Sequence, residues 1–260
     1  MKWRQFNSLI LLAAYELRCS RVTWIMLATL CVALGIGSFV ADLAVTESAA
    51  HRLTFYAASV RILTVAALCL LAASNVVRDS QDHVLALMLA RPISRSQWLL
   101  AKAAAYVLGG WGIAIIVALP LLLLGAAPEA VIAWGLAFAC ELSIMIVAAI
   151  VAASGVAQVT VAFGAVMGFY LLCRSIRSLV LLTQDSMIDP RTTANQWMAW
   201  LVNALAHMIP DLARFTPGWL VYPSSQGHWM TEIPFILIQT AIAVPLLLVV
   251  GLIDFQRRDL

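Results

Sequence analysis

Six long apolar stretches divide this chain and leave little room for any other kind of structure. A helix that crosses the hydrocarbon core of a bilayer needs about 20 apolar residues, and each stretch reaches that length. Only 11% of the 260 residues are charged, against about 25% in soluble domains. We therefore expect an all-α, polytopic membrane protein with six transmembrane helices at about 22–45, 53–77, 98–127, 128–153, 155–177 and 233–255.

Two regions outside these spans have the pattern of helices that lie along the membrane surface. Residues 1–21 hold a short apolar run followed by Glu16, Arg18 and Arg21, which predicts an interfacial elbow rather than a cleaved signal peptide. Residues 183–230 contain an apolar helical face, with Asn195 as a candidate cap and Pro210 as a stop. We expect this second region to be a re-entrant or interfacial outer segment. Residues 1–260 then form a single transmembrane domain.

The distribution of basic residues predicts the orientation of the chain. If the N-terminus is cytoplasmic, most of the 16 Lys and Arg residues fall on the cytoplasmic side, as the positive-inside rule requires. Both termini are then expected to be cytoplasmic. The net charge of +3 is small and scattered, so nucleic acid is not an expected partner. The five cysteines form no C-x-x-C pair, and we interpret them as small apolar residues rather than metal ligands.

The stretch LALMLARPISRSQWLLAK, at 85–102, interrupts the apolar pattern between the second and third spans. The acidic residues Asp79 and Asp82 precede a leucine-rich run, which predicts a short amphipathic helix on the cytoplasmic side. Proline disfavours helix in the residue before it, so Arg91-Pro92 ends this helix. Ser94 then provides a cap for the third span. Residues 78–97 are therefore expected to form a cytoplasmic helix and a turn.

The order of these features resembles the membrane subunits of type-2 ABC exporters. LMLARPISRSQWLLAK is similar to the coupling helix and Pro-Ile/Val-Ser-Arg turn of that family. AAYELRCSRVTWIM (13–26), HMIPDLARFTPGWLVY (207–222) and DFQRRDL (254–260) resemble its elbow, its re-entrant outer segment and its C-terminal tail. One departure is that Asp79-Ser-Gln-Asp82-His83 stands where the family often has Glu-x-Glu-x-Gly-Thr. The contact with a partner is expected to differ in detail for that reason.

The resemblance implies a permease subunit that exports a substrate across a bacterial cytoplasmic (inner) membrane. Two such subunits, expected to be copies of the same chain among membrane lipids, would work with two ATPase subunits. The chain has no G-x-x-x-x-G-K-[ST] loop, so it is expected to be no enzyme and to hold no cofactor, with ATP and Mg on the ATPase. The residues expected to contact the ATPase are Asp79, Asp82, His83, Leu85, Leu87, Met88, Arg91, Pro92 and Arg95.

Charged residues within or at the ends of the expected spans form a second group of candidates. They are Glu141 in the fourth span, Arg61 in the second, and Arg174 and Arg177 near the outer end of the fifth. A charge at this depth costs about 2.5–3.5 kcal/mol on insertion scales, so it usually has a partner or faces water. By depth, Arg61 and Arg174 are candidate partners of Glu141. The group either lines a translocation path or is a buried ion pair.

Glycines at helix spacing indicate where helices can approach closely. Gly164-x-x-x-Gly168 lies in the fifth span, and Gly35 and Gly37 lie in the first. Because the first and fifth spans form the dimer contact in the family that the chain resembles, these glycines are candidates for that contact. Packing within one chain is the alternative.

Two other classes of function can be compared with the exporter on sequence grounds. An ion-coupled secondary transporter would use Glu141 and Arg61, but the two related halves that many such folds have are not visible. An intramembrane protease, haem protein or quinone protein needs histidines at membrane depth. The four histidines all lie outside the expected spans.

Overall fold

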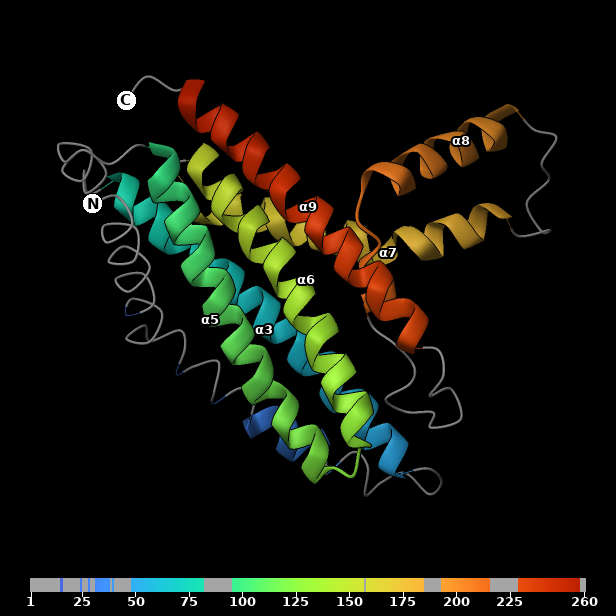
Figure 1. Cartoon of the computed structure of the whole chain (residues 1–260). Coiled ribbons are helices and arrows are strands. Elements are labelled where there is room, and N and C mark those ends of the chain that lie inside the picture. The colour runs from blue at the N-terminus through green and yellow to red at the C-terminus, as the bar shows by residue number, and fades with distance from the viewer. Residues whose placement is uncertain are drawn as a thin grey trace.

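The computed structural model describes residues 31–37, 48–81, 95–156, 158–184, 193–215 and 229–257, together with positions 15, 24, 28 and 39. All secondary structure in this part of the chain is helical. The elements are α3 (Ser48–Gln81), α5 (Arg95–Leu123), α6 (Pro128–Gly155), α7 (Val159–Gln184), α8 (Thr193–Met208), the short 3-10 helix η1 (Leu212–Phe215) and α9 (Trp229–Arg257), as Figure 1 shows.

Five of the described helices are long and apolar enough to cross a membrane, so the chain is a polytopic helical membrane protein. These helices are α3, α5, α6, α7 and α9, which correspond to the second to sixth expected spans. Within the first expected span, 22–45, residues 31–37 are helical, and most of the other positions lie outside the described residues. The elbow at 1–21, apart from position 15, also lies outside them. The first expected span and the elbow therefore stay predictions, and so does the total of six spans.

Several helix ends differ from those expected from apolarity. α3 continues to Gln81, because backbone hydrogen bonding can extend a helix beyond its apolar part. α7 continues to Gln184, and the added residues include the apolar run 179–182. The fourth and fifth expected spans, 128–153 and 155–177, leave only residue 154 between them, but α6 continues to Gly155 and the turn begins at Val156. Ser154 remains helical, with its hydroxyl donating to the Val151 carbonyl at 2.8 Å, a local bond that helices accommodate.

The turn between α5 and α6 lies where the third and fourth expected spans, 98–127 and 128–153, meet. Gly125 has a φ of +89°, a backbone conformation that is costly for residues with a Cβ. The amides of Gly125 and Ala126 donate to the carbonyls of Leu122 and Leu121 at 3.1 and 3.0 Å. This pair of bonds is a Schellman motif. Pro128 then begins α6, so the two helices form a tight antiparallel hairpin.

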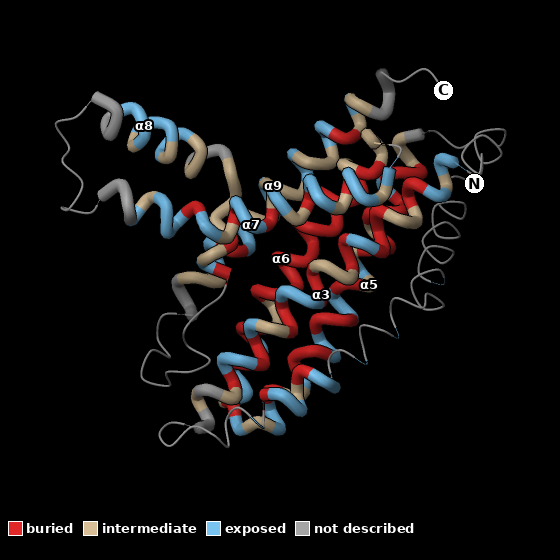
Figure 2. The backbone as a smooth tube through the Cα atoms, turned by 180° about the vertical axis from the view of Figure 1, so that it is seen from behind, coloured by how far each residue is buried: buried red, intermediate tan, exposed pale blue. Residues whose placement is uncertain are grey.

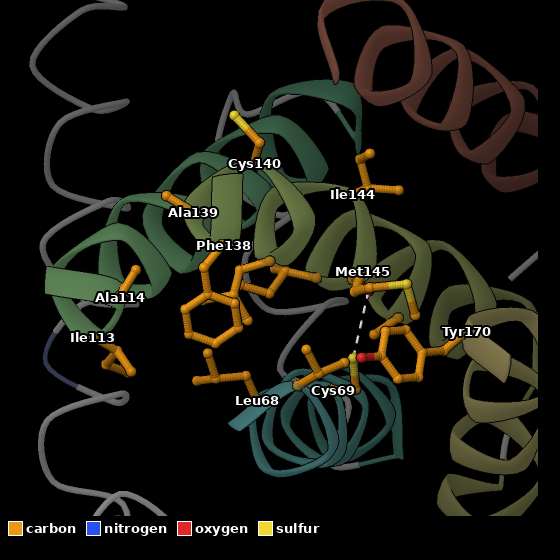
Figure 3. Packing of buried hydrophobic residues seen from close by; sticks show 14 of the residues in the cluster. Leu68, Cys69, Ile113, Ala114, Phe138, Ala139, Cys140, Ile144, Met145 and Tyr170 are labelled. Atoms are coloured by element: carbon orange, nitrogen blue, oxygen red, sulfur yellow. Dashed lines mark hydrogen bonds between the residues drawn. The ribbon is translucent and has the colours of Figure 1, made fainter. Parts of the chain in front are cut away.

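α6 is the central helix of the described bundle. It packs against α3, α5, α7 and α9, and 83% of its most apolar window is buried, as the nearly continuous red of Figure 2 shows. A helix that is apolar on every side is expected to occupy such a position. In Figure 3, Phe138 and Met145 of α6 lie over Leu68 and Cys69 of α3. Tyr170 of α7 points toward the same layer.

Glycines bring two neighbours especially close to α6. A Cβ added at Gly110 of α5 would lie 2.7 Å from Ile146 Cδ1, and one at Gly251 of α9 would lie 2.6 Å from Val151 Cγ2. Real Cβ atoms do not make such contacts, so something must shift if either glycine is replaced. Ile146 Cδ1 is the end of a flexible side chain and can move away, whereas three atoms of Val151, its Cβ included, lie close to Gly251, so Gly251 requires glycine at the present helix separation. Close approach through small residues is a general device of membrane helix packing.

The segment between α7 and α9 is partly buried in the bundle. α8 packs beside the second half of α7, and the pair diverges from α9 in Figure 1. Leu212 and Phe215 of η1 are fully buried against α6, α7 and α9. α8 ends at Met208, two residues before the predicted stop at Pro210. Asn195 is not the cap that was expected, because α8 already begins at Thr193.

Candidate functional site

The central charged contact of the bundle joins α3 and α6. Arg61 Nε lies 3.1 Å from Glu141 Oε2, and both side chains have an exposed fraction of 0%. The two atoms do not meet hydrogen-bond geometry, so this contact is an ion pair held mainly by Coulomb attraction. Such attraction is much stronger inside a protein than in water.

A second arginine approaches the same carboxylate from α7. Arg174 Nη1 lies 3.3 Å from Glu141 Oε1 and also donates to the Tyr170 hydroxyl at 3.4 Å. Two cations therefore share one anion, and the cluster carries a net charge of +1. Arg174 keeps 24% of its side chain exposed, which allows the excess charge to remain partly solvated at the outer edge of the cluster.

Arg61 also connects the bundle to η1. Its Nη1 atom donates to the Phe215 carbonyl at 2.7 Å. The centre of its guanidinium lies 5.2 Å from the ring centroid of Trp134 and 5.4 Å from that of Phe138, within the range of cation–π attraction. The cluster therefore ties α3, α6, α7 and η1 together at one depth.

The burial of this cluster bears on the two interpretations of its charges. A group that lines a path must meet water or substrate, but Arg61 and Glu141 are enclosed by the described residues. Breaking a buried pair is strongly destabilising. The geometry therefore favours a buried ion pair that stabilises the bundle over residues that line a translocation path.

Arg177 is not part of the cluster, although its depth in the sequence had grouped it with Arg174. It lies three residues further along α7, is exposed, and faces a cleft that Asp211 and Arg214 also line. Side chains three residues apart lie on the same side of a helix but point in different directions around its axis. Arg174 points inward here and Arg177 does not.

A second charged contact lies at the end of the bundle where α3 stops and α5 starts. Lys102 Nζ forms an ion pair with Asp79 Oδ2 and lies 5.4 Å from the ring centroid of Trp98. One turn deeper, Asn75 Nδ2 donates to the Tyr106 hydroxyl at 2.5 Å. These contacts fix the last turns of α3 to the first turns of α5.

This geometry places only part of the expected ATPase contact. Asp79 belongs to the end of α3 and is largely buried against α5 rather than freely presented. Arg95 begins α5. The other expected contact residues lie outside the described residues: Asp82, His83, Leu85, Leu87, Met88, Arg91 and Pro92.

The candidate dimer glycines separate into two groups. A Cβ at Gly37 would lie 3.5 Å from Phe55 Cδ1, so this residue packs on α3 of its own chain. Cβ atoms at Gly35, Gly164 and Gly168 would meet nothing within 4 Å in the described part of the chain. No other described element therefore covers the face of α7 that carries Gly164 and Gly168.

Sequence reasoning missed the contact of Arg61 with the Phe215 carbonyl and the pairing of Asp79 with Lys102. The contact of Arg61 with the Phe215 carbonyl could not be found from the sequence, because no side-chain pattern marks a backbone acceptor. The Asp79–Lys102 pair had a weak signal in the sequence, because the two residues of opposite charge flank the same interruption of the apolar pattern.

Comparison with models of known protein families gave no match, and comparison with curated proteins gave no significant match.

Proposed function

We propose that this chain is the membrane-spanning subunit of a type-2 ABC exporter, which moves a substrate outward with energy from ATP hydrolysed by a separate ATPase. The support is the sequence resemblance together with a helix order that fits it. The chain itself is then no enzyme and binds no cofactor. ATP and Mg belong to the partner.

The observation that carries the proposal is the contact between the end of α3 and the start of α5. Residues 82–94 connect these two ends, and the Asp79–Lys102 ion pair fixes the point from which the segment leaves and returns. Because the segment that contains Leu85, Leu87 and Met88 connects two helices that are held together at this point, a force on it would act on α3 and α5 together. An apolar helix that docks in a groove of the partner is a common recognition mode.

The proposed orientation follows from the same end of the bundle. α3, α6 and α9 end there, while α5 and α7 begin there (Figure 1). This end includes Arg78, Lys102 and Arg257, so the positive-inside rule favours the cytoplasm. We place the chain in a bacterial inner membrane with both termini inside. A second copy would pack on the open Gly164–Gly168 face of α7.

Copurification tests the proposal. The tagged chain is purified in mild detergent from its native membrane, and the proteins retained with it are identified by mass spectrometry. Leu87→Asp combined with Met88→Asp should remove a Walker-type ATPase that accompanies the parent chain. The control is Leu123→Asp, which puts a charge on a leucine that is 89% exposed at the opposite end of α5 and should keep the ATPase.

Either of two results would contradict the proposal. One is that no ATPase accompanies the parent chain under conditions that retain the subunits of a known ABC complex purified in parallel. The other is that the double variant keeps the ATPase as well as the control does. Elution from a sizing column at the position of the parent chain verifies that each variant is folded.

An ion-coupled secondary transporter that uses Glu141 and Arg61 is the alternative function. It receives less support, because both side chains are enclosed where an ion would need access. Transport that continues in vesicles containing this chain alone, driven by an ion gradient, would favour the alternative.

A further inference from the structure

A cleft of about 620 Å³ lies between α7, the end of α8, η1 and α9. Its walls are mostly apolar, with Ile176, Val180 and Ile242 among the lining residues. Three charged residues also line it: Arg177, Asp211 and Arg214. Because α7 and α9 both belong to the set of membrane-crossing helices, the cleft opens between two such helices, near the end of the apolar part of α7 and the start of that of α9.

The charges of the cleft are unbalanced. Arg214 Nε pairs with Asp211 Oδ2 at 3.2 Å, and its guanidinium lies 4.6 Å from the Phe235 ring centroid. Arg177 is exposed and has no ion-pair partner among the described residues. The cleft therefore has a net charge of +1, with one guanidinium available to a ligand.

A smaller apolar cavity of about 250 Å³ adjoins the cleft. Ile209, Gln239 and Ile242 line both spaces, and Phe169 and Leu246 line only the smaller one. The Oε1 atom of Gln239 is buried and has no hydrogen-bond partner within the described residues. A buried polar atom without a hydrogen-bond partner is unusual in a folded protein.

The depths of these groups match the layers of a phospholipid. The apolar part of α7 ends at Leu181. Arg177 lies near that end, at the depth expected for lipid headgroups. Gln239 lies seven residues into the apolar part of α9, which begins at Glu232. This is about 10 Å along a helix, at the level of the glycerol esters and the first acyl carbons.

We propose that this cleft binds one anionic phospholipid, with its phosphate at Arg177 and Arg214 and an acyl chain in the smaller cavity. The net positive charge selects an anionic headgroup over a zwitterionic one. Gln239 lines both spaces, and a rotation about its last side-chain bond exchanges the amide oxygen and NH2 group, so that the NH2 group can donate to an ester carbonyl there. The site depends only on the chain itself and not on an ATPase.

Native mass spectrometry of the purified full chain tests this site. Phosphatidylglycerol is added to protein in a neutral detergent, with phosphatidylcholine of the same acyl chains as the competitor. We expect one phosphatidylglycerol per chain, retained about tenfold more strongly than phosphatidylcholine. Arg177→Gln should reduce that preference to about twofold or less. Arg52→Gln, which changes an arginine outside the cleft near the start of α3, should leave it intact.

A second variant examines the apolar part of the site. Leu246→Trp enlarges a side chain that lines the smaller cavity, so it should weaken retention of both lipids while the headgroup preference remains. Glycerol phosphate, which has the phosphate but no acyl chain, should not compete. Equal retention of the two lipids by the parent chain would overturn the proposal, as would equal losses in Arg177→Gln and Arg52→Gln or full competition by glycerol phosphate.

Discussion

Removal of the Glu141 charge is the most direct test of the buried cluster. Glu141→Gln keeps the size of the side chain but leaves Arg61, which is fully buried, beside Arg174 with no anion. Loss of one partner of a buried pair costs about 3–5 kcal/mol. Arg61 keeps its bond to the Phe215 carbonyl and its position over Trp134. We therefore expect the lower end of the range, about 3 kcal/mol.

Buried cysteines provide the assay. Cys69, Cys140 and Cys173 are buried and unpaired, whereas Cys31 is exposed. A dye that becomes fluorescent on reacting with thiols will therefore report unfolding once Cys31 and Cys19 are replaced by serine. For a domain of 150–250 residues, 1 kcal/mol corresponds to about 2–4 °C in the midpoint. Glu141→Gln should accordingly lower the midpoint of thermal unfolding by about 6–12 °C.

A solvent-accessible pair gives the matched control. Asp211→Asn removes the partner of Arg214, whose side chain is 44% exposed, and exposed pairs contribute about 1 kcal/mol or less. Its midpoint should fall by no more than about 4 °C. Adding Arg61→Met to Glu141→Gln removes the stranded charge and should recover part of the loss. Equal shifts for Glu141→Gln and Asp211→Asn, or no recovery in the double variant, would refute the reasoning.

Three glycine substitutions are predicted to differ in the same unfolding assay. Gly251→Ala should cost about 1–3 kcal/mol through the clash with Val151, and Val151→Ala should relieve it. Gly125→Ala should cost about 1–2 kcal/mol because of the positive φ. Gly112→Ala, with open space around its Cβ in the described structure, should gain up to about 1 kcal/mol from helix propensity. A common effect of all three would contradict these local explanations.

The five described spans were predictable because the length of an apolar run alone decides whether a helix can cross the bilayer. The ends of those helices were less predictable. α7 continues to Gln184, beyond the end of its apolar part at Leu181, and hydropathy does not report backbone hydrogen bonding there. The start of α6 at Pro128 was predicted because proline suits the first position of a helix without any tertiary context.

The charged cluster was only partly predictable. Glu141 was matched with Arg61 and Arg174 by depth, since a charge within an apolar span needs a partner. Depth did not separate Arg177 from Arg174, because that requires the rotation of α7 about its axis. The bond from Arg61 to the Phe215 carbonyl depends on a short 3-10 helix 154 residues away in the chain, and no local pattern encodes that position.

The bond between Arg61 and Phe215 has a consequence for how the protein is made. Arg61 is synthesised long before Glu141, and 154 residues before Phe215. At about 5–20 residues per second, the last of these partners emerges about 8–31 s after Arg61. During that interval α3 holds an arginine at bilayer depth without its final neighbours. Arg61 lacks the Glu141 carboxylate until α6 has followed, and the Phe215 carbonyl until η1 has followed. The complete cluster cannot form before Phe215 has been synthesised, and α9, which follows Phe215 in the chain, packs on α6 only later.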